Sequence, residues 1–172
     1  DEVHASLLEG GNLSSLQLES VAYAAKRHSQ RDGADCTCGF FLGDGAGVGK
    51  GRQIAGMILN TTLSGPAPTS HHRKHVWISA SNDLRHDACR DLEAVGWREE
   101  EHGKLRDTND FSFEERLSGH KHGGVLYCTY SWLSSKSRGG GAKRKKEGGT
   151  PSKHVFESRL EQLLQWCGGP AF

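Results

Sequence analysis

A glycine-rich segment over residues 43–52 (GDGAGVGKGR) constrains the fold of this chain more than any other feature of its sequence. It follows the short apolar run Phe40-Phe41-Leu42, which predicts a buried strand, and it precedes a helix predicted over about 52–60. A strand, a glycine-rich turn and a helix in this order are what a phosphate-binding P-loop requires. The sequence therefore predicts a loop whose backbone N–H groups bind phosphate at the positive end of a helix dipole.

The residue types in this loop suit that role. Glycine at alternate positions lets backbone amides approach an anion without side chains in the way. Lys50 would reach the β- and γ-phosphates of a nucleotide as a point charge. Arg52 either supports an acidic site or only lies in the first helical turn, where a cation opposes the dipole. The predicted nucleotide-binding residues of the loop are Gly45, Ala46, Gly47, Val48, Gly49, Lys50, Gly51 and Arg52.

Two positions depart from the strict P-loop pattern G-x-x-x-x-G-K-[ST]. Asp44 stands where the pattern has glycine, and Gly51 stands where it has serine or threonine. The hydroxyl that normally binds Mg²⁺ is therefore missing, and the metal would have to be held by water, by the phosphates and by an acid elsewhere. No predicted strand ends in an acidic pair, and the clusters 99–101 and 114–115 are typical of solvated surfaces. No catalytic residue is assigned from the sequence.

Further strands and helices are predicted along the rest of the chain. The apolar runs 76–78 and 125–129 predict strands. Ser14 and Gln17 match a capping box at the start of a helix, and Ser81-Asn82-Asp83 are predicted to cap another. Apolar residues at helical spacing predict helices over about 14–28, 84–95 and 155–166. Strands that alternate with helices predict a parallel α/β sheet, of which three strands are visible.

Composition bounds the class of protein. The 172 residues suffice for one domain. The 22 Lys and Arg nearly balance 21 Asp and Glu, which excludes a strongly basic nucleic-acid-binding protein. No apolar run is long enough to cross a membrane, and no signal peptide is visible. The first residue is Asp1 rather than Met, so we expect the sequence to start inside a longer protein.

Cysteine and histidine usage predicts no metal site. The five cysteines are an odd number at scattered positions, which indicates reduced intracellular thiols. Only one residue separates Cys36 from Cys38, too few for the usual zinc knuckle. The histidines at positions 71, 72 and 75 are predicted to lie in a solvated loop. Residues 134–153 form a low-complexity basic segment, which we predict to be a disordered insertion.

The glycine-rich segment 43–52 closely resembles the P-loop of the strawberry notch proteins, which are helicase-like, superfamily-2-type proteins of eukaryotic nuclei. In this family glycine characteristically replaces the serine or threonine of other P-loops, as Gly51 does here. The resemblance covers most of residues 12–168 and lapses in 29–38, 97–121 and 134–153. The stretches that carry it, in the order of the family, are 13–19, 43–52, 77–84 with Asp87 and 90–92, 129–131, and 159–160 with 162–168.

The resemblance implies a three-layer, RecA-like P-loop NTPase fold, with a parallel sheet between flanking helices. Residues 1–172 would be an incomplete first lobe of this domain, with the basic insertion at 134–153. In the family an Asp-Glu-x-His motif follows shortly after a Trp-Cys-Gly segment, here residues 166–168. We expect this motif and a second lobe to follow Phe172, so the chain alone should not hydrolyse ATP. ATP and Mg²⁺ are the expected cofactors of the full-length protein.

Several polar residues keep two interpretations. Gln17 would read adenine through its amide, as the upstream glutamine of related helicases does, or would serve only in the capping box. Ser79, Ser81 and Asn82 would contact a nucleic-acid backbone, or would only cap the following helix. The basic run 143–146 would be a nuclear-localisation or DNA-tethering patch, or a solvated surface run.

Two functions are compatible with this sequence. One is an ATP-dependent engine that acts on DNA or chromatin in transcription control. The other is a non-catalytic nuclear co-regulator that uses the lobe as a nucleotide-gated or structural platform for histones or transcription factors. The missing hydroxyl at Gly51 favours slow or absent turnover. The resemblance implies a location in the nucleus in both cases.

Overall fold

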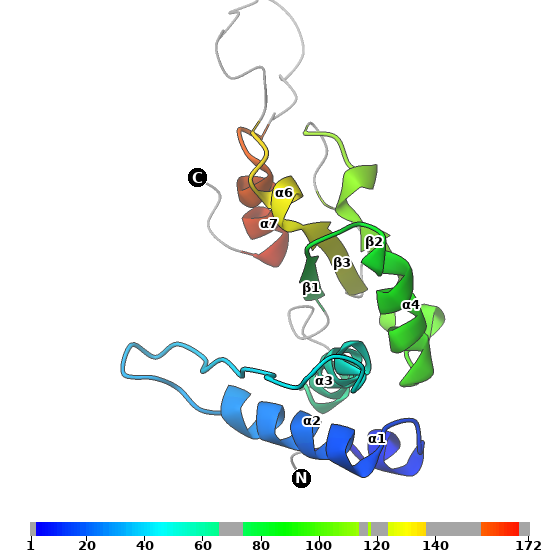
Figure 1. The fold of residues 1–172 in the computed structure, drawn as a ribbon. Helices are drawn as coiled ribbons and strands as arrows, with labels where there is room; N and C mark the ends of the chain where they lie inside the picture. The colour runs from blue at the N-terminus through cyan, green and yellow to red at the C-terminus, as the bar shows by residue number, and fades with distance from the viewer. Residues whose placement is uncertain (1–2, 66–73, 114–116, 118–123, 137–155, 169–172) are drawn as a thin grey trace, which may run out of the picture.

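The computed structural model of the chain describes residues 3–65, 74–113, 117, 124–136 and 156–168 (Figure 1). Within these residues, three parallel strands form a sheet in the order β1-β3-β2. The strands are β1 (Lys74–Ser79), β2 (Leu105–Asp107) and β3 (Gly124–Thr129). Val76 and Arg106 both lie opposite Leu126 of the central strand. A parallel sheet with flanking helices confirms the predicted α/β class.

The helices fall into three groups along the chain. Before the first strand come α1 (Ala5–Glu9), α2 (Ser15–His28) and α3 (Lys50–Ser64). Between β1 and β3 in sequence lie α4 (Leu84–Ala94), α5 (Glu99–His102) and the 3-10 helix η2 (Thr108–Asp110). After β3 come α6 (Tyr130–Leu133) and α7 (Arg159–Cys167). Among the described residues, no helix has the length and apolar character that crossing a membrane requires.

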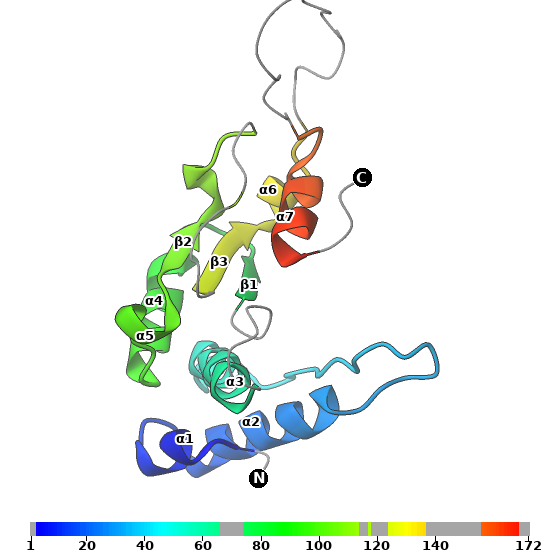
Figure 2. The same cartoon turned by 180° about the vertical axis from the view of Figure 1, so that it is seen from behind.

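The central strand β3 organises the core, because its residues are buried along its whole length. Val125 and Tyr127 belong to a buried cluster with side chains of α2, α3 and α4. Leu126 and Cys128 belong to a second cluster, which includes Trp132 of α6. The sheet is therefore covered on both faces, and this explains why a continuous apolar run, rather than an alternating pattern, predicted the strand. Figures 1 and 2 show α2 and α3 near the amino ends of the strands and α6 at the carboxyl end of β3.

The predicted strand over Phe40-Phe41-Leu42 is wrong. This segment pairs with none of the three described strands, and the Phe41 side chain is 90 % exposed. An apolar run forms a strand only where a partner strand satisfies its backbone N–H and C=O groups, and periodicity does not reveal the partner. The third strand of the described sheet is instead β2, in a segment for which no strand was predicted. Three residues are too few for alternating burial to be detected from sequence.

The other predicted elements are confirmed, with shifts at their ends. Helix α3 begins at Lys50 and reaches Ser64, so it is longer than the predicted 52–60. Helix α7 begins at Arg159 rather than near 155, because the Ser158 side chain accepts a hydrogen bond from the backbone N–H of Glu161 as its N-cap. Of the predicted insertion, residues 137–153 lie outside the described residues.

His75 corrects a second prediction, because it lies in β1 and not in a solvated loop, whereas residues 71 and 72 lie outside the described part of the chain. Its Nε2 is 2.8 Å from the Oγ1 of Thr62, near the end of α3. Burial lowers the pKa of His75 from 6.5 to about 4. The folded state therefore holds this imidazole neutral at pH values where the unfolded chain would protonate it.

We expect the stability of the chain to fall in acid because of His75. The contribution of His75 to the free energy of unfolding should be constant above pH 6.5 and should decrease between pH 6.5 and about 4, by up to about 3 kcal/mol. Urea unfolding at a series of pH values measures this slope. In His75→Gln, which keeps a polar side chain but does not titrate, the slope should be reduced. Identical pH profiles for the two proteins would show that other groups set the acid stability.

Candidate nucleotide-binding site

The glycine-rich loop has the backbone that an anion site needs at the start of α3. Gly49 is the N-cap residue, with φ 78° and ψ 39°, and Gly47 has φ 84°. Non-glycine residues rarely adopt this left-handed region, so both positions favour glycine. No side chain forms a cap hydrogen bond with the start of α3, and the first turn holds no acidic residue of its own. The backbone N–H groups of this turn are therefore left for another partner.

Lys50 folds back across the loop. Its Nζ donates to the backbone carbonyl oxygens of Asp44, at 2.9 Å, and of Gly45, at 2.6 Å. These bonds place the ammonium group over the loop that it terminates. Arg52, which follows in the first turn of α3, is half-buried.

Asp44, the first departure from the P-loop pattern, ties the start of the loop to α3. Its Oδ2 accepts a hydrogen bond of 2.9 Å from Nε2 of Gln53. Gln53 is only 2 % exposed, and its Oε1 is buried without a hydrogen-bond partner. A buried unpaired oxygen costs about 1–3 kcal/mol, so Gln53 stays in this position at some cost to stability. The sequence analysis did not identify Gln53, because nothing in the pattern marks one buried amide on a helix.

Gln17 makes both a helix cap and a contact with the loop. The capping box is present, because Oε1 of Gln17 accepts from the Ser14 backbone N–H and Oγ of Ser14 accepts from the Gln17 backbone N–H. Its Nε2 also donates to the backbone carbonyl of Val48, at 3.3 Å. A Cβ atom at Gly49 would lie 2.6 Å from this same Nε2, so the loop approaches Gln17 closely. The capping interpretation is confirmed, and adenine recognition by Gln17 stays a prediction.

Gly51, the second departure, faces a carboxylate from another helix. A Cβ atom built at this position would collide with Oδ2 of Asp91, which lies near the end of α4. The Asp91 side chain is 14 % exposed, and Nη2 of Arg90 lies 3.5 Å from its Oδ1. Asp91 was not named from the sequence as a residue near the loop, because only the packing of α3 against α4 brings it there. The signal in the sequence was Gly51 itself, where a hydroxyl residue is the rule.

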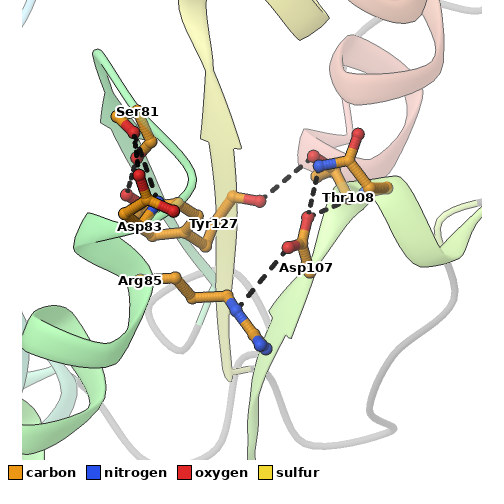
Figure 3. Close-up of polar contacts among 7 residues, drawn as sticks. Ser81, Asp83, Arg85, Asp107, Thr108 and Tyr127 are labelled. Atoms are coloured by element: carbon orange, nitrogen blue, oxygen red, sulfur yellow. Dashed lines mark hydrogen bonds and ion pairs between the residues drawn. The ribbon is translucent and has the colours of Figure 1, made fainter.

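The predicted nucleic-acid residues lie elsewhere, at the carboxyl edge of the sheet (Figure 3). Ser79 ends β1, and Oη of Tyr127 donates to the backbone carbonyl of Ser81 at 2.6 Å. Oγ of Ser81 donates to Oδ2 of Asp83 and accepts from the Asp83 backbone N–H, both at 3.3 Å. Asp83 is the N-cap residue of α4 but its side chain makes no cap hydrogen bond. Ser81 therefore supplies the side-chain oxygen for the turn that precedes α4, whereas the side chain of Asp83 does not cap the helix.

A polar cleft of about 460 Å³ lies at this edge. Hydroxyl and amide side chains dominate its lining, among them Ser81, Asn82, Asn109, Thr129 and Ser131. The carboxyl ends of parallel strands are the usual place for ligands in α/β folds. Ser81 and Asn82 thus share one cleft, as a common nucleic-acid contact would require. The structure does not bring this cleft to the glycine loop, because α3 lies near the opposite ends of the strands (Figures 1 and 2).

Asp107 is an acidic residue at the end of β2. It was not identified from the sequence, because β2 itself was not predicted. Its Oδ1 accepts hydrogen bonds from the backbone N–H and from Nδ2 of Asn109, each at 2.9 Å, and Nε of Arg85 lies 3.6 Å from its Oδ2. Figure 3 shows the Arg85 ion pair beside the bond from Oγ1 of Thr108 to the Tyr127 carbonyl. Both carboxylate oxygens are therefore occupied in holding β2, η2 and α4 together.

Metal ligands of the usual kind do not gather in the described part of the chain: no group of three His, Cys, Asp or Glu side chains there could hold an ion. All five cysteines are free thiols. Asp44 and Asp91 are nevertheless two carboxylates at the glycine loop. Nucleotide-bound Mg²⁺ commonly takes only one or two protein carboxylates beside the phosphates. The residues present therefore fit a metal that arrives with a nucleotide.

A family model described as P-loop containing NTP hydrolase pore-1 matches residues 1–172. Protein strawberry notch homolog 1 of Gallus gallus is 38 % identical over 164 residues, which are 94 % of this chain and 12 % of that protein. Protein strawberry notch of Drosophila melanogaster is 38 % identical over 161 residues, which are 94 % of this chain and 9 % of that protein. Protein FORGETTER 1 of Arabidopsis thaliana is 39 % identical over 156 residues, which are 91 % of this chain and 10 % of that protein.

The chain thus spans roughly a tenth of the length of the curated relatives that it matches. No solved structure matches it. The agreement of the family model with the described sheet and helices shows an incomplete P-loop NTPase fold of the RecA-like kind.

Proposed function

Because this chain belongs to the strawberry notch family and forms part of its helicase-like P-loop NTPase domain, we propose that residues 45–52 bind the phosphates of ATP. The observation that carries this proposal is the backbone of the loop. Two glycines with positive φ lead into a helix start that no side chain caps, and Lys50 lies over the same loop. A loop that served only as a turn would not need this combination.

Binding would use groups that the loop already holds in place. Backbone N–H groups over 45–51 would donate to the phosphates, and Nζ of Lys50 would exchange its two carbonyl acceptors for phosphate oxygens. Gln17 lies against Val48 and would be placed to contact adenine. Mg²⁺, when bound with the nucleotide, would neutralise phosphate charge and polarise the γ-phosphate.

The polar cleft at the carboxyl edge of the sheet is our candidate for nucleic-acid contact. Ser79 ends the strand that leads to it, and Ser81 and Asn82 belong to its lining. Serine and asparagine are common donors to phosphate oxygens of a nucleic-acid backbone, and such contacts position a strand without reading its sequence. The described lining of this cleft holds no charged side chain. Such contacts would position a strand rather than bind it strongly, since basic side chains supply most of the salt-dependent affinity.

The biological setting that we propose is the eukaryotic nucleus, with DNA or chromatin as the partner. The protein would act in the regulation of DNA-templated transcription, either on DNA itself or through histones and transcription factors. Similarity to strawberry notch proteins supports this assignment. A second candidate is a non-catalytic co-regulator that uses the lobe as a nucleotide-gated or structural scaffold. The absence of a hydroxyl at Gly51 favours that candidate, because the usual Mg²⁺ ligand is missing.

ATP turnover separates the two candidates. The assay compares a protein that contains this chain and a second lobe with its Lys50→Ala variant, each with and without double-stranded DNA. For an engine we expect turnover that DNA stimulates and that the variant loses. Nucleotide binding without Lys50-dependent turnover would establish the scaffold.

A further inference from the structure

Gly51 and Asp91 form a complementary pair at the nucleotide loop. The glycine lies in the first turn of α3, where most P-loops carry a hydroxyl side chain. Any Cβ atom there would collide with Oδ2 of Asp91, so the carboxylate occupies the volume that a serine or threonine side chain would take. Helix α4 thus supplies an oxygen where α3 lacks one.

The Asp91 carboxylate has few partners for a group that is mostly buried. Nη2 of Arg90 lies at 3.5 Å, but the closer contact of Arg90, at 2.7 Å, is with Oδ1 of Asp87. The positive end of the α3 dipole favours the Asp91 carboxylate, since the first turn of α3 carries no acid of its own. A bound phosphate would compete for the same helix end, and two anions there would repel each other.

A divalent cation that binds with the nucleotide near Asp91 would remove this repulsion. We propose that Asp91 replaces the missing hydroxyl residue of the P-loop and provides a carboxylate oxygen for the Mg²⁺ of the bound nucleotide. Carboxylate oxygens are hard ligands of the kind that Mg²⁺ prefers, and one or two of them commonly complete a nucleotide-bound ion. This proposal rests on the proposed function, because it needs a nucleotide on the loop.

The alternative hypothesis is that Asp91 has only a structural role. In that case its charge stabilises the start of α3, and its removal would weaken the fold and the binding of nucleotide in the same proportion with and without metal. The two roles therefore differ in the dependence of nucleotide affinity on Mg²⁺. Activity is not needed to separate them.

The test is calorimetric titration of the 172-residue chain with ATP, in Mg²⁺ and in EDTA. For the wild type we expect Mg²⁺ to strengthen binding by roughly tenfold or more, within the usual range of coupling between two ligands. Compared with the wild type, Asp91→Asn should bind ATP more weakly in Mg²⁺ and more tightly in EDTA. Its affinity should therefore be nearly the same under the two conditions. The matched control is Asp87→Asn, which removes an exposed carboxylate (51 % exposed) that contacts the same arginine and should behave as wild type.

An exchange of the two positions provides a second test. Gly51→Ser alone should force the Asp91 carboxylate aside, because the serine side chain and Oδ2 of Asp91 need the same volume. Asp91→Ala alone should remove the effect of Mg²⁺. The double variant Gly51→Ser/Asp91→Ala has the ordinary P-loop hydroxyl and space for it, so it should recover most of the Mg²⁺ effect that Asp91→Ala loses. Such recovery is a non-additive result that two independent losses do not produce.

The failures are distinguishable. Wild-type binding with equal affinity in Mg²⁺ and EDTA, or equal losses in Asp91→Asn under both conditions, would overturn the metal role and leave the nucleotide site intact. No binding by a wild-type chain that unfolds cooperatively would overturn the nucleotide site, and the metal role with it.

Discussion

Replacing Lys50 by alanine should weaken ATP binding by roughly 100-fold, because hydrogen bonds between a charged donor and a phosphate contribute about 1.5–3 kcal/mol. Nζ of Lys50 already lies over the loop, where it donates to the carbonyl oxygens of Asp44 and Gly45. Phosphate oxygens would accept these hydrogen bonds in the complex. The substitution should therefore destabilise the complex with ATP rather than the free protein. Calorimetric titration with ATP in Mg²⁺ measures the effect.

The same substitution should leave the fold almost unchanged. The two acceptor carbonyls are exposed, so water can replace the ammonium group as their donor, and the free energy of unfolding should change by less than about 0.5 kcal/mol. Lys104→Ala, which removes an exposed lysine just before β2, is the control and should bind ATP as the wild type does. Equal affinities of wild type and Lys50→Ala would show that the loop does not bind triphosphate.

Replacing Leu126 by alanine should cost about 3 kcal/mol of unfolding free energy, since large-to-small changes in a packed core leave a cavity. Leu126 is 2 % exposed on the central strand, where it packs with Trp132 and Leu163. Domains of this size have about 5–15 kcal/mol of stability in total, so one such change removes a large share of it. Urea unfolding followed by circular dichroism measures the loss.

Leu84→Ala is the matched control for that experiment. Leu84 is 46 % exposed at the start of α4, so the same change of side chain should alter stability by no more than about 0.5 kcal/mol. A small effect at Leu126, comparable with that at Leu84, would mean that the second buried cluster does not hold the sheet and α6–α7 together.

The sequence predicted the elements whose signal is local. Helix α2 was found because its apolar spacing and its capping box both lie within one segment. Strand β3 was found because a strand buried on both faces is a continuous apolar run. The segment 40–42 has the same kind of run but no described partner, and β2 has a partner but only three residues. Pairing is a property of two segments, and a pattern in one of them does not contain it.

The residues of the candidate site also fall into those with a local signal in the sequence and those that only packing brings together. The glycine loop and Lys50 were predicted from consecutive residues, and the structure gives Gly47 and Gly49 the positive φ that such a loop needs. Asp91 and Gln53 reach the loop from a turn of α4 and from the buried side of α3. Packing of one helix on another selects these residues, and no spacing rule connects position 51 with position 91.

The side chain of Gln17 couples the start of α2 to the glycine-rich loop. Its amide oxygen accepts from Ser14 while its amide nitrogen donates to Val48, so fraying of the helix and movement of the loop are not independent events. A ligand that forms hydrogen bonds with the amide oxygen of Gln17 must first break its bond to the Ser14 N–H, and the loss of this cap costs about 1 kcal/mol. A partner that stabilises the first turn of α2 would therefore change the affinity for nucleotide without touching it. By reciprocity, the nucleotide would change the affinity for that partner by the same factor.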